Sequence, residues 1–121
     1  MQHHIGTDII EIERIRRAIE RYGDRFLNRV FTKAELGIYG HRAHSLAASF
    51  ASKEAVMKLL GTGTWGVAWR EIETLYHPSG KPLIKLNGRA VKRAEKLGIK
   101  EIDVSLSHSK EYATATAIGA T

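Results

Sequence analysis

The stretch from about Ser45 to Leu60 constrains the fold of this chain more than any other segment. Its apolar side chains recur at helical spacing, which predicts a helix of about four turns with one apolar arc. Alanines give the neighbouring surface small side chains suited to close packing, and Gly61 is typical of a residue that ends a helix. The apolar arc consists of Leu46, Phe50, Val56, Met57 and Leu60, and the small-residue face of Ala47, Ala48, Ala51 and Ala55. The segment therefore predicts a long central helix.

The other patterns predict short strands and helices around this helix. Strands are expected near residues 5–10, 71–76, 83–86, 102–106 and 112–118. Helices are expected at residues 11–22, after the capping box that Thr32 forms with Glu35, and from Asn87 to Gly98. No linker, repeat or low-complexity stretch interrupts them. The order predicts a single α+β domain over residues 1–121, with a mostly antiparallel sheet packed against helices.

The composition excludes several classes of protein. The chain has no cysteine, which rules out disulfides, thiolate catalysis and cysteine-bound metals. No apolar run approaches the roughly 18 residues of a membrane span, and no basic segment followed by an apolar stretch indicates a signal peptide. A reducing cytoplasm is the simplest location. The net charge of +6 favours an anionic partner: nucleic acid, a membrane surface, a polyphosphate ligand or an acidic protein.

Three charged residues stand where apolar residues are expected. Asp8 lies within the apolar strand, so its carboxylate either faces solvent or is paired or bound to a cation. Lys53 falls on the apolar arc of the central helix, where it either extends along the helix to water or points into a crevice beside a carboxylate. Glu54 lies at the edge of the arc, one turn before Lys58. The default interpretation of that pair is a weak surface salt bridge.

Two loops carry groups that suit phosphate. The loop Gly61–Gly66 is rich in glycine, yet it follows a helix and lacks the P-loop lysine, so a simple helix cap is the alternative. The segment Ser105–Lys110 offers hydroxyls, an imidazole and an ammonium group, and it has no hydrolase motif. The other histidine pairs, His3/His4 and His41/His44, lack convincing metal spacing and are interpreted as surface residues.

The first predicted helix has a basic face opposite its isoleucines. Arg14, Arg17 and Arg21 lie within about 60° of one another, and Arg25 continues the stripe if the helix persists. The stripe is either an ordinary solvated face or a docking edge for an anionic partner.

Five motifs occur in an order typical of one enzyme family. Gly6-Thr7-Asp8 is followed by Phe50-Ala51-Ser52-Lys53-Glu54-Ala55, Lys58-Leu59-Leu60-Gly61-Thr62-Gly63, Gly80-Lys81-Pro82 and Ser105-Leu106-Ser107-His108. In these motifs the chain resembles the holo-[acyl-carrier-protein] synthases, the short single-domain phosphopantetheinyl transferases. The resemblance covers nearly the whole chain. It departs from many members at Ser49, where they carry a basic residue, and Arg42 is a candidate replacement.

The resemblance implies a role for each motif. It implies that Asp8 and Glu54 bind Mg²⁺ and act in catalysis with Lys58. It also implies coenzyme A contacts, and that the family's homotrimer places each site between subunits. The implied coenzyme A contacts are Lys53, Lys58, Gly61, Gly63, Lys81, Pro82, Ser107 and His108.

The implied reaction is the transfer of phosphopantetheine from coenzyme A to a serine of an acyl carrier protein, in support of fatty acid biosynthesis. The carrier is acidic in this family, which makes the arginine stripe a plausible dock. A metal-bound water or a carboxylate is the candidate base. The main alternative is a basic nucleic-acid-binding domain without catalysis, and a purely structural trimer is a weaker one. The transferase interpretation predicts neither a nucleic-acid nor a membrane partner.

Overall fold

Two antiparallel sheets form the framework of the computed structural model, which describes all 121 residues. The larger sheet has the order β1-β5-β4, with β1 at His3–Glu11, β4 at Glu101–His108 and β5 at Tyr112–Ala120. The smaller sheet pairs β2 (Ile72–Tyr76) with β3 (Pro82–Leu86). β3 packs beside the outer edge of β4 without a ladder of hydrogen bonds to it. β1 and β4 are therefore opposite edges of the three-stranded sheet.

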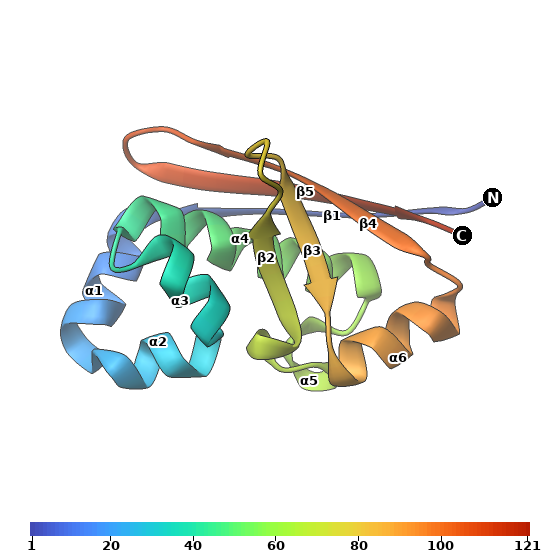
Figure 1. Ribbon diagram of the computed structural model, residues 1–121, viewed down its shortest axis with the longest axis horizontal. Coiled ribbons are helices and arrows are strands. Elements are labelled where there is room, and N and C mark those ends of the chain that lie inside the picture. The colour runs from blue at the N-terminus through green and yellow to red at the C-terminus, as the bar shows by residue number, and fades with distance from the viewer.

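The helices cover one face of this sheet, and the other face is bare (Figure 1). They are α1 (Ile12–Tyr22), α2 (Asp24–Val30), α3 (Lys33–Tyr39), α4 (Ala43–Leu60), α5 (Gly63–Gly66) and α6 (Gly88–Leu97). A 3-10 turn, η1 (Trp69–Glu71), leads into β2. None of the helices is both long enough and apolar enough to cross a membrane.

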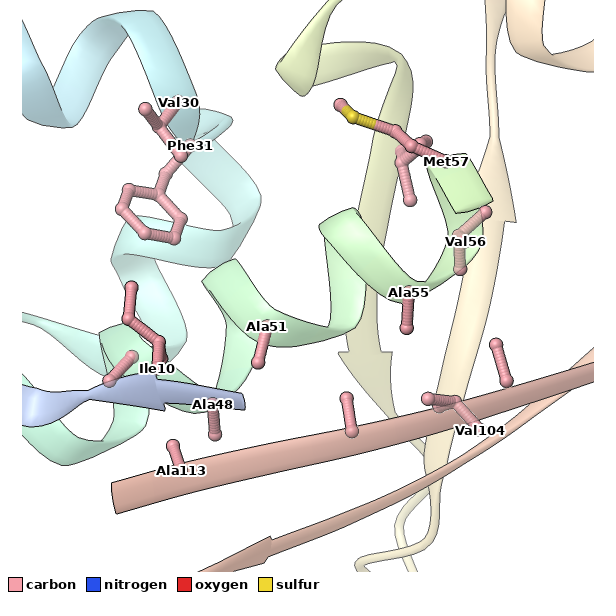
Figure 2. Packing of buried hydrophobic residues seen from close by; sticks show 14 of the residues in the cluster. Ile10, Val30, Phe31, Ala48, Ala51, Ala55, Val56, Met57, Val104 and Ala113 are labelled. Atoms are coloured by element: carbon pink, nitrogen blue, oxygen red, sulfur yellow. The ribbon is translucent and has the colours of Figure 1, made fainter. Parts of the chain in front are cut away.

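The small-residue face of α4 lies directly on the three-stranded sheet. Figure 2 shows Ala48, Ala51 and Ala55 pointing toward the strands, with Ala113 of β5 below them. The closest approach is at Gly6 of β1, where an added Cβ would lie 1.8 Å from the backbone oxygen of Ala55. Glycine at this position lets the two backbones touch. The predicted central helix is thus confirmed as the centre of the core.

The α+β class and the mostly antiparallel pairing are also confirmed, and the differences are local. Gly23, with φ 56°, ends α1, so Arg25 lies on the separate helix α2 and not on a continued α1. Tyr22, expected on the apolar face, is half exposed because the chain turns away at this glycine. The central helix begins at Ala43, slightly earlier than expected.

Candidate active site

Two carboxylates and one lysine meet where β1 crosses α4. Asp8 shares the inward-facing side of β1 with Gly6 and Ile10, and only 11% of its side chain is exposed. Lys58 Nζ donates to Asp8 Oδ1 at 3.2 Å and to the backbone oxygen of Thr7 at 2.9 Å. Asp8 and Glu54, predicted from separate motifs, therefore lie in one cluster with Lys58. The pairing of Lys58 differs from the expected salt bridge within the helix, because its ionic partner is Asp8 of β1.

Burial and the neighbouring Asp8 carboxylate together raise the pKa of Glu54. The pKa of Glu54 is raised from 4.5 to about 7, mainly by burial and then by the neighbouring charge and hydrogen bond of Asp8. The positive charges of Lys58 and Arg14 oppose this rise. A bound cation would relieve the remaining repulsion. The ionic environment therefore favours a cation between Asp8 and Glu54.

The donor set fits magnesium. Mg²⁺ commonly takes one or two carboxylates from the protein and completes its shell with water and substrate phosphates. The chain offers two carboxylates here, and no group of three or more histidine, aspartate or glutamate side chains gathers anywhere to form an all-protein site. The pair thus suits a metal that is shared with a phosphate-bearing substrate.

Lys53 does not join this cluster, and its side chain points into the interior of the protein instead. Its ammonium group is 0% exposed and donates to Glu35 Oε1 at 2.7 Å, to Trp69 O at 3.2 Å and to Ile72 O. An ammonium group has three donors, and all of them are satisfied inside the protein. Burial lowers the pKa of Lys53, and the Glu35 carboxylate opposes that fall. The carboxylate beside this lysine is Glu35 from α3, a partner that the sequence did not reveal.

Ser49 is an interior residue, and Arg42 is an exposed residue at the end of α3. Ser49 is 1% exposed, and its hydroxyl donates to Glu35 Oε2. Arg42 donates from Nε and a terminal nitrogen to the backbone oxygens of Tyr39 and Ile38, at the end of α3. Position 49 is thus an interior position in this chain.

The glycine-rich loop is chiefly the end of α4. Gly61, with φ 72°, has its backbone N–H on the carbonyls of Lys58 and Met57, which is the geometry of a helix C-cap. Gly63, with φ 55°, opens the four-residue helix α5, and nothing lies within 4 Å of a Cβ added there. Lys81 is exposed in the turn between β2 and β3, and Pro82 opens β3.

His108 ends β4 beside a residue that sequence reasoning treated as ordinary surface. Its ring centroid lies 5.3 Å from that of His44, near the start of α4. The two rings border an open hollow of about 500 Å³ whose other lining residues are Ile12, Arg16, Ser109 and Lys110. No carboxylate lines this hollow, so it suits an anion. Helical spacing alone gave no signal for His44, because its partner comes from the far end of the chain.

Within one chain, the hollow beside His108 is separated from Asp8. In the sheet register Asp8 pairs with Ala115, which pairs with Leu106, and Ser107 and His108 follow on β4. Asp8 is thus on the β1 edge and His108 on the β4 edge, two strand spacings or about 10 Å apart across the sheet. The structure brings together Asp8, Glu54 and Lys58, with Arg14 nearby, and places Ser107 and His108 at the end of β4. Lys81 lies apart from both groups in the sequence, in the turn between β2 and β3.

The arginines predicted to bind a partner are all exposed. Arg17 lies 4.0 Å from Glu13, and Arg21 lies over the ring of Tyr22, 5.5 Å from its centroid. Arg14 differs from them because it acts electrostatically on Glu54. The stripe therefore starts beside the carboxylate pair and runs away from it along α1, with Arg25 following on α2.

Comparison with known proteins gives a consistent result. The sequence model of the 4'-phosphopantetheinyl transferase superfamily matches residues 4–117. A holo-[acyl-carrier-protein] synthase from Dehalococcoides mccartyi is 53% identical over 115 residues, covering 95% of this chain and 96% of the relative. One from Gloeobacter violaceus is 52% identical over 118 residues, covering 94% and 89%.

Solved structures agree over the same length. The holo-[acyl-carrier-protein] synthase of Neisseria meningitidis superposes with a TM-score of 0.90 at 33% identity, covering 98% of each chain. The Helicobacter pylori enzyme, solved in complex with coenzyme A, superposes with a TM-score of 0.88 at 29% identity, covering 96% of this chain and 99% of that one. Because the family model matches nearly the whole chain and the relatives are about half identical to it over almost their full length, this chain belongs to the holo-[acyl-carrier-protein] synthase family of 4'-phosphopantetheinyl transferases.

Proposed function

We propose that this chain transfers the 4'-phosphopantetheine group of coenzyme A to a serine of apo-acyl carrier protein, with Mg²⁺ held by Asp8 and Glu54. The observation that carries the proposal is the carboxylate pair beside Lys58 at the junction of β1 and α4. Hard oxygen ligands next to an ammonium group suit a metal–pyrophosphate complex. The products are holo-acyl carrier protein and adenosine 3',5'-bisphosphate.

Catalysis in such a transfer is mostly positioning and charge neutralisation. The serine hydroxyl gives its proton to a base, for which a carboxylate or a metal-bound water is the candidate, and its oxygen forms a bond to the β-phosphorus. The bond from that phosphorus to the bridging oxygen breaks, and the bridging oxygen leaves on adenosine 3',5'-bisphosphate. Mg²⁺, when bound, neutralises charge on the pyrophosphate and on the leaving oxygen. Lys58 donates hydrogen bonds to Asp8 and to the Thr7 carbonyl, so its ammonium group is held beside the two carboxylates proposed to bind the metal. We assign Asp8, Glu54 and Lys58 as the catalytic group on this basis.

The nucleotide end of coenzyme A is proposed to meet the cationic surface around His108. The hollow with His44, Arg16 and Lys110 has no acidic lining, which suits the phosphates of the donor. Ser107 adds a hydroxyl at the same strand end, and Lys81 is exposed in the β2–β3 turn. Pro82, Gly61 and Gly63 are proposed as backbone neighbours of the ligand, on the strength of the motifs alone.

A homotrimer with sites between subunits is proposed because the bare sheet face carries a cluster of exposed isoleucines among its polar side chains. Ile5 pairs directly with Ile118 across β1 and β5, and both are exposed, as is Ile9 on the same face. Helices do not cover this face (Figure 1), so a second copy of the chain would bury it. Assembly would also let the β1 edge of one chain meet the β4 edge of another, which would complete a site that one chain leaves divided.

The acyl carrier protein is proposed to dock on α1 and α2. Tyr22, Arg25, Phe26 and Arg29 line an open depression of about 390 Å³, and Arg21 lies beside Tyr22. This surface combines exposed guanidinium groups with aromatic rings, a composition that suits an acidic protein partner. We further propose that the transferase domain spans residues 1–121 and acts in the cytoplasm in support of fatty acid biosynthesis.

A transfer assay tests the function directly. Protein, coenzyme A, Mg²⁺ and an apo-acyl carrier protein should give a carrier whose mass has increased by one phosphopantetheine group. Asp8→Ala and Glu54→Ala should each remove most of this activity and leave the melting temperature close to that of the unmodified protein. Near-normal rates for either variant at limiting Mg²⁺ would exclude that residue as a ligand.

A binding assay separates the transferase from a nucleic-acid-binding domain. The protein should retain coenzyme A only when Mg²⁺ is present, and should release a single-stranded or double-stranded oligonucleotide at physiological salt. Retention of the oligonucleotide without retention of coenzyme A would favour the nucleic-acid alternative.

A further inference from the structure

The buried Lys53–Glu35 ion pair has more partners than a simple charge pair needs. Besides the Lys53 ammonium, the Glu35 carboxylate accepts hydrogen bonds from the backbone nitrogens of Thr32 (3.0 Å) and Thr74 (2.9 Å). It also accepts one from the Ser49 hydroxyl at 3.1 Å. Through these bonds and those of the ammonium group, the pair connects α4 with α3, η1 and β2. A network with every donor and acceptor satisfied holds one geometry firmly.

The opposite side of α4 is fixed by a different contact. Gly6 brings the β1 backbone against α4, and an added Cβ there would lie 1.8 Å from Ala55 O and 2.8 Å from Leu59 N. The helix is therefore held between a steric contact with β1 on one side and the ionic network on the other. Glu54 lies between these two constraints, because it directly follows Lys53 and directly precedes Ala55.

Stability alone is a poor explanation for an ion pair at this position. Removing two charges from water is expensive, and apolar residues of similar volume often replace a buried ion pair without loss of stability. A buried ionic network is better suited to selecting one arrangement. A rotation of α4 by about 20° would displace a carboxylate about 6 Å from the helix axis by about 2 Å. A metal site tolerates a displacement of only about 0.5 Å.

We propose that the Lys53–Glu35 pair is a positioning device that fixes the rotation of α4 and thereby sets the affinity of the Asp8–Glu54 pair for its divalent cation. Lys53 and Glu35 act through Glu54 and touch neither metal nor substrate. The inference rests on the proposed function, because it concerns the metal site assigned there. It replaces the predicted phosphate contact of Lys53 with an indirect role.

The test is a direct measurement of metal affinity in a variant without the ion pair. Mn²⁺ serves as the probe metal, and free Mn²⁺ is measured by electron paramagnetic resonance in the presence of coenzyme A. The double variant Lys53→Met/Glu35→Gln removes both charges and keeps similar volumes. Its Mn²⁺ affinity should fall by about 10-fold to 100-fold, the range seen when the support of a metal ligand is removed. The KM for the carrier protein should stay unchanged, because the docking surface is on α1 and α2.

A matched control separates positioning by the ion pair from a general weakening of the contact between α4 and β2. Thr74 Oγ1 donates to Ser52 Oγ at 2.9 Å between β2 and α4, and both residues are fully buried. Ser52→Ala/Thr74→Val removes this bond without touching the ion pair. The control should lower the melting temperature and leave Mn²⁺ affinity unchanged.

The Mn²⁺ affinities of the double variant and of the control decide the proposal. Unchanged Mn²⁺ affinity in the double variant would overturn the positioning role, as would an equal loss of affinity in the control. If the double variant does not fold, Ser49→Ala removes one hydrogen bond from Glu35. A smaller fall in affinity would then support the proposal, and no change would overturn it. Unmodified protein that binds no Mn²⁺, or that binds it independently of Asp8, would refute the metal site itself and the inference with it.

Discussion

Glu54 should make the stability of the metal-free protein depend on pH. Its pKa in the folded chain is about 7, compared with 4.5 ordinarily, because of burial and the Asp8 carboxylate. Between these values the folded chain keeps a proton that the unfolded chain releases. This contribution to stability is therefore fully present below about pH 4.5 and is lost as the pH rises to about 7. Thermal melting in a chelating buffer should show the loss.

The variant Glu54→Gln supplies the control for this pH dependence, because its amide does not titrate. The difference in melting temperature between the two proteins should change steadily between pH 5 and pH 7. Adding Mg²⁺ at pH 7.5 should restore stability to the unmodified protein and not to the variant, since a bound cation stabilises the folded state. Parallel melting profiles for the two proteins would contradict the raised pKa of Glu54.

At the residue scale, the sequence predicted the positions of charges better than their partners. Asp8 drew attention because a carboxylate in an apolar segment requires an explanation. Glu54 was assigned to the site only through the resemblance of its motif. Lys53 drew attention for the same reason as Asp8, yet its partner Glu35 could not be found from sequence. Glu35 belongs to a recognisable capping box, and that local role masks the hydrogen bonds it also makes to α4 and β2. Helical periodicity shows which face a residue occupies, not which distant segment covers that face.

At the scale of elements, the contact between β1 and α4 should be the most sensitive in the fold. Gly6→Ala would place a methyl group 1.8 Å from the Ala55 carbonyl, so either the strand or the helix must move. We expect a loss of about 3 kcal/mol of folding free energy, at the upper end for an overpacked core. Because the same movement separates Asp8 from Glu54, activity should fall even at temperatures where the variant is folded. Urea unfolding and the transfer assay measure the two effects.

Gly37→Ala is a matched control for Gly6→Ala. Gly37 lies in α3, and nothing is within 4 Å of a Cβ added there. Alanine should therefore stabilise the protein, by up to about 1 kcal/mol, through its higher helix propensity. A Gly6→Ala protein as stable as the Gly37→Ala protein would show that α4 is not held against β1.

The arginine surface of α1 and α2 should affect the carrier protein and not coenzyme A. Reversing Arg21 and Arg25 to glutamate should raise the KM for the carrier protein by a factor on the order of ten and flatten its dependence on salt. The KM for coenzyme A should change little. Arg14 is left intact, because its charge acts on Glu54 and reversing it would disturb the carboxylate pair proposed to bind the metal.

A second charge reversal tests whether the location of these arginines matters. Lys92→Glu/Lys96→Glu on α6 changes the net charge by the same amount, and both lysines are exposed. This variant should keep a normal KM for the carrier protein. Equal effects from the two double reversals would attribute docking to overall charge instead of to the α1–α2 surface.

At the scale of the whole molecule, the sequence predicted most helices and strands. It could not predict that the strand order places the site residues on two opposite edges of the sheet. Patterns of period 2 and 3.6 identified the strands and long helices, because one face of each is buried. The strand order β1-β5-β4 depends on contacts between the two ends of the chain, which local patterns do not report. That order places Asp8 and His108 on opposite edges of the sheet. Only the family resemblance, and not the spacing of residues, anticipated a site shared between subunits.

The shared site can be tested by mixing two inactive proteins. Asp8→Ala and His108→Ala chains each lack one half of the proposed site. If β1 of one subunit meets β4 of its neighbour, a mixed trimer contains some interfaces where both residues are intact, and activity should partly return. Subunits must first be exchanged, for example by mild denaturation and refolding, and mixed trimers confirmed by mass spectrometry of differently tagged chains. Confirmed mixed trimers without recovered activity would mean that each site is built within one chain or that His108 is dispensable, and single-variant rates would distinguish these two results.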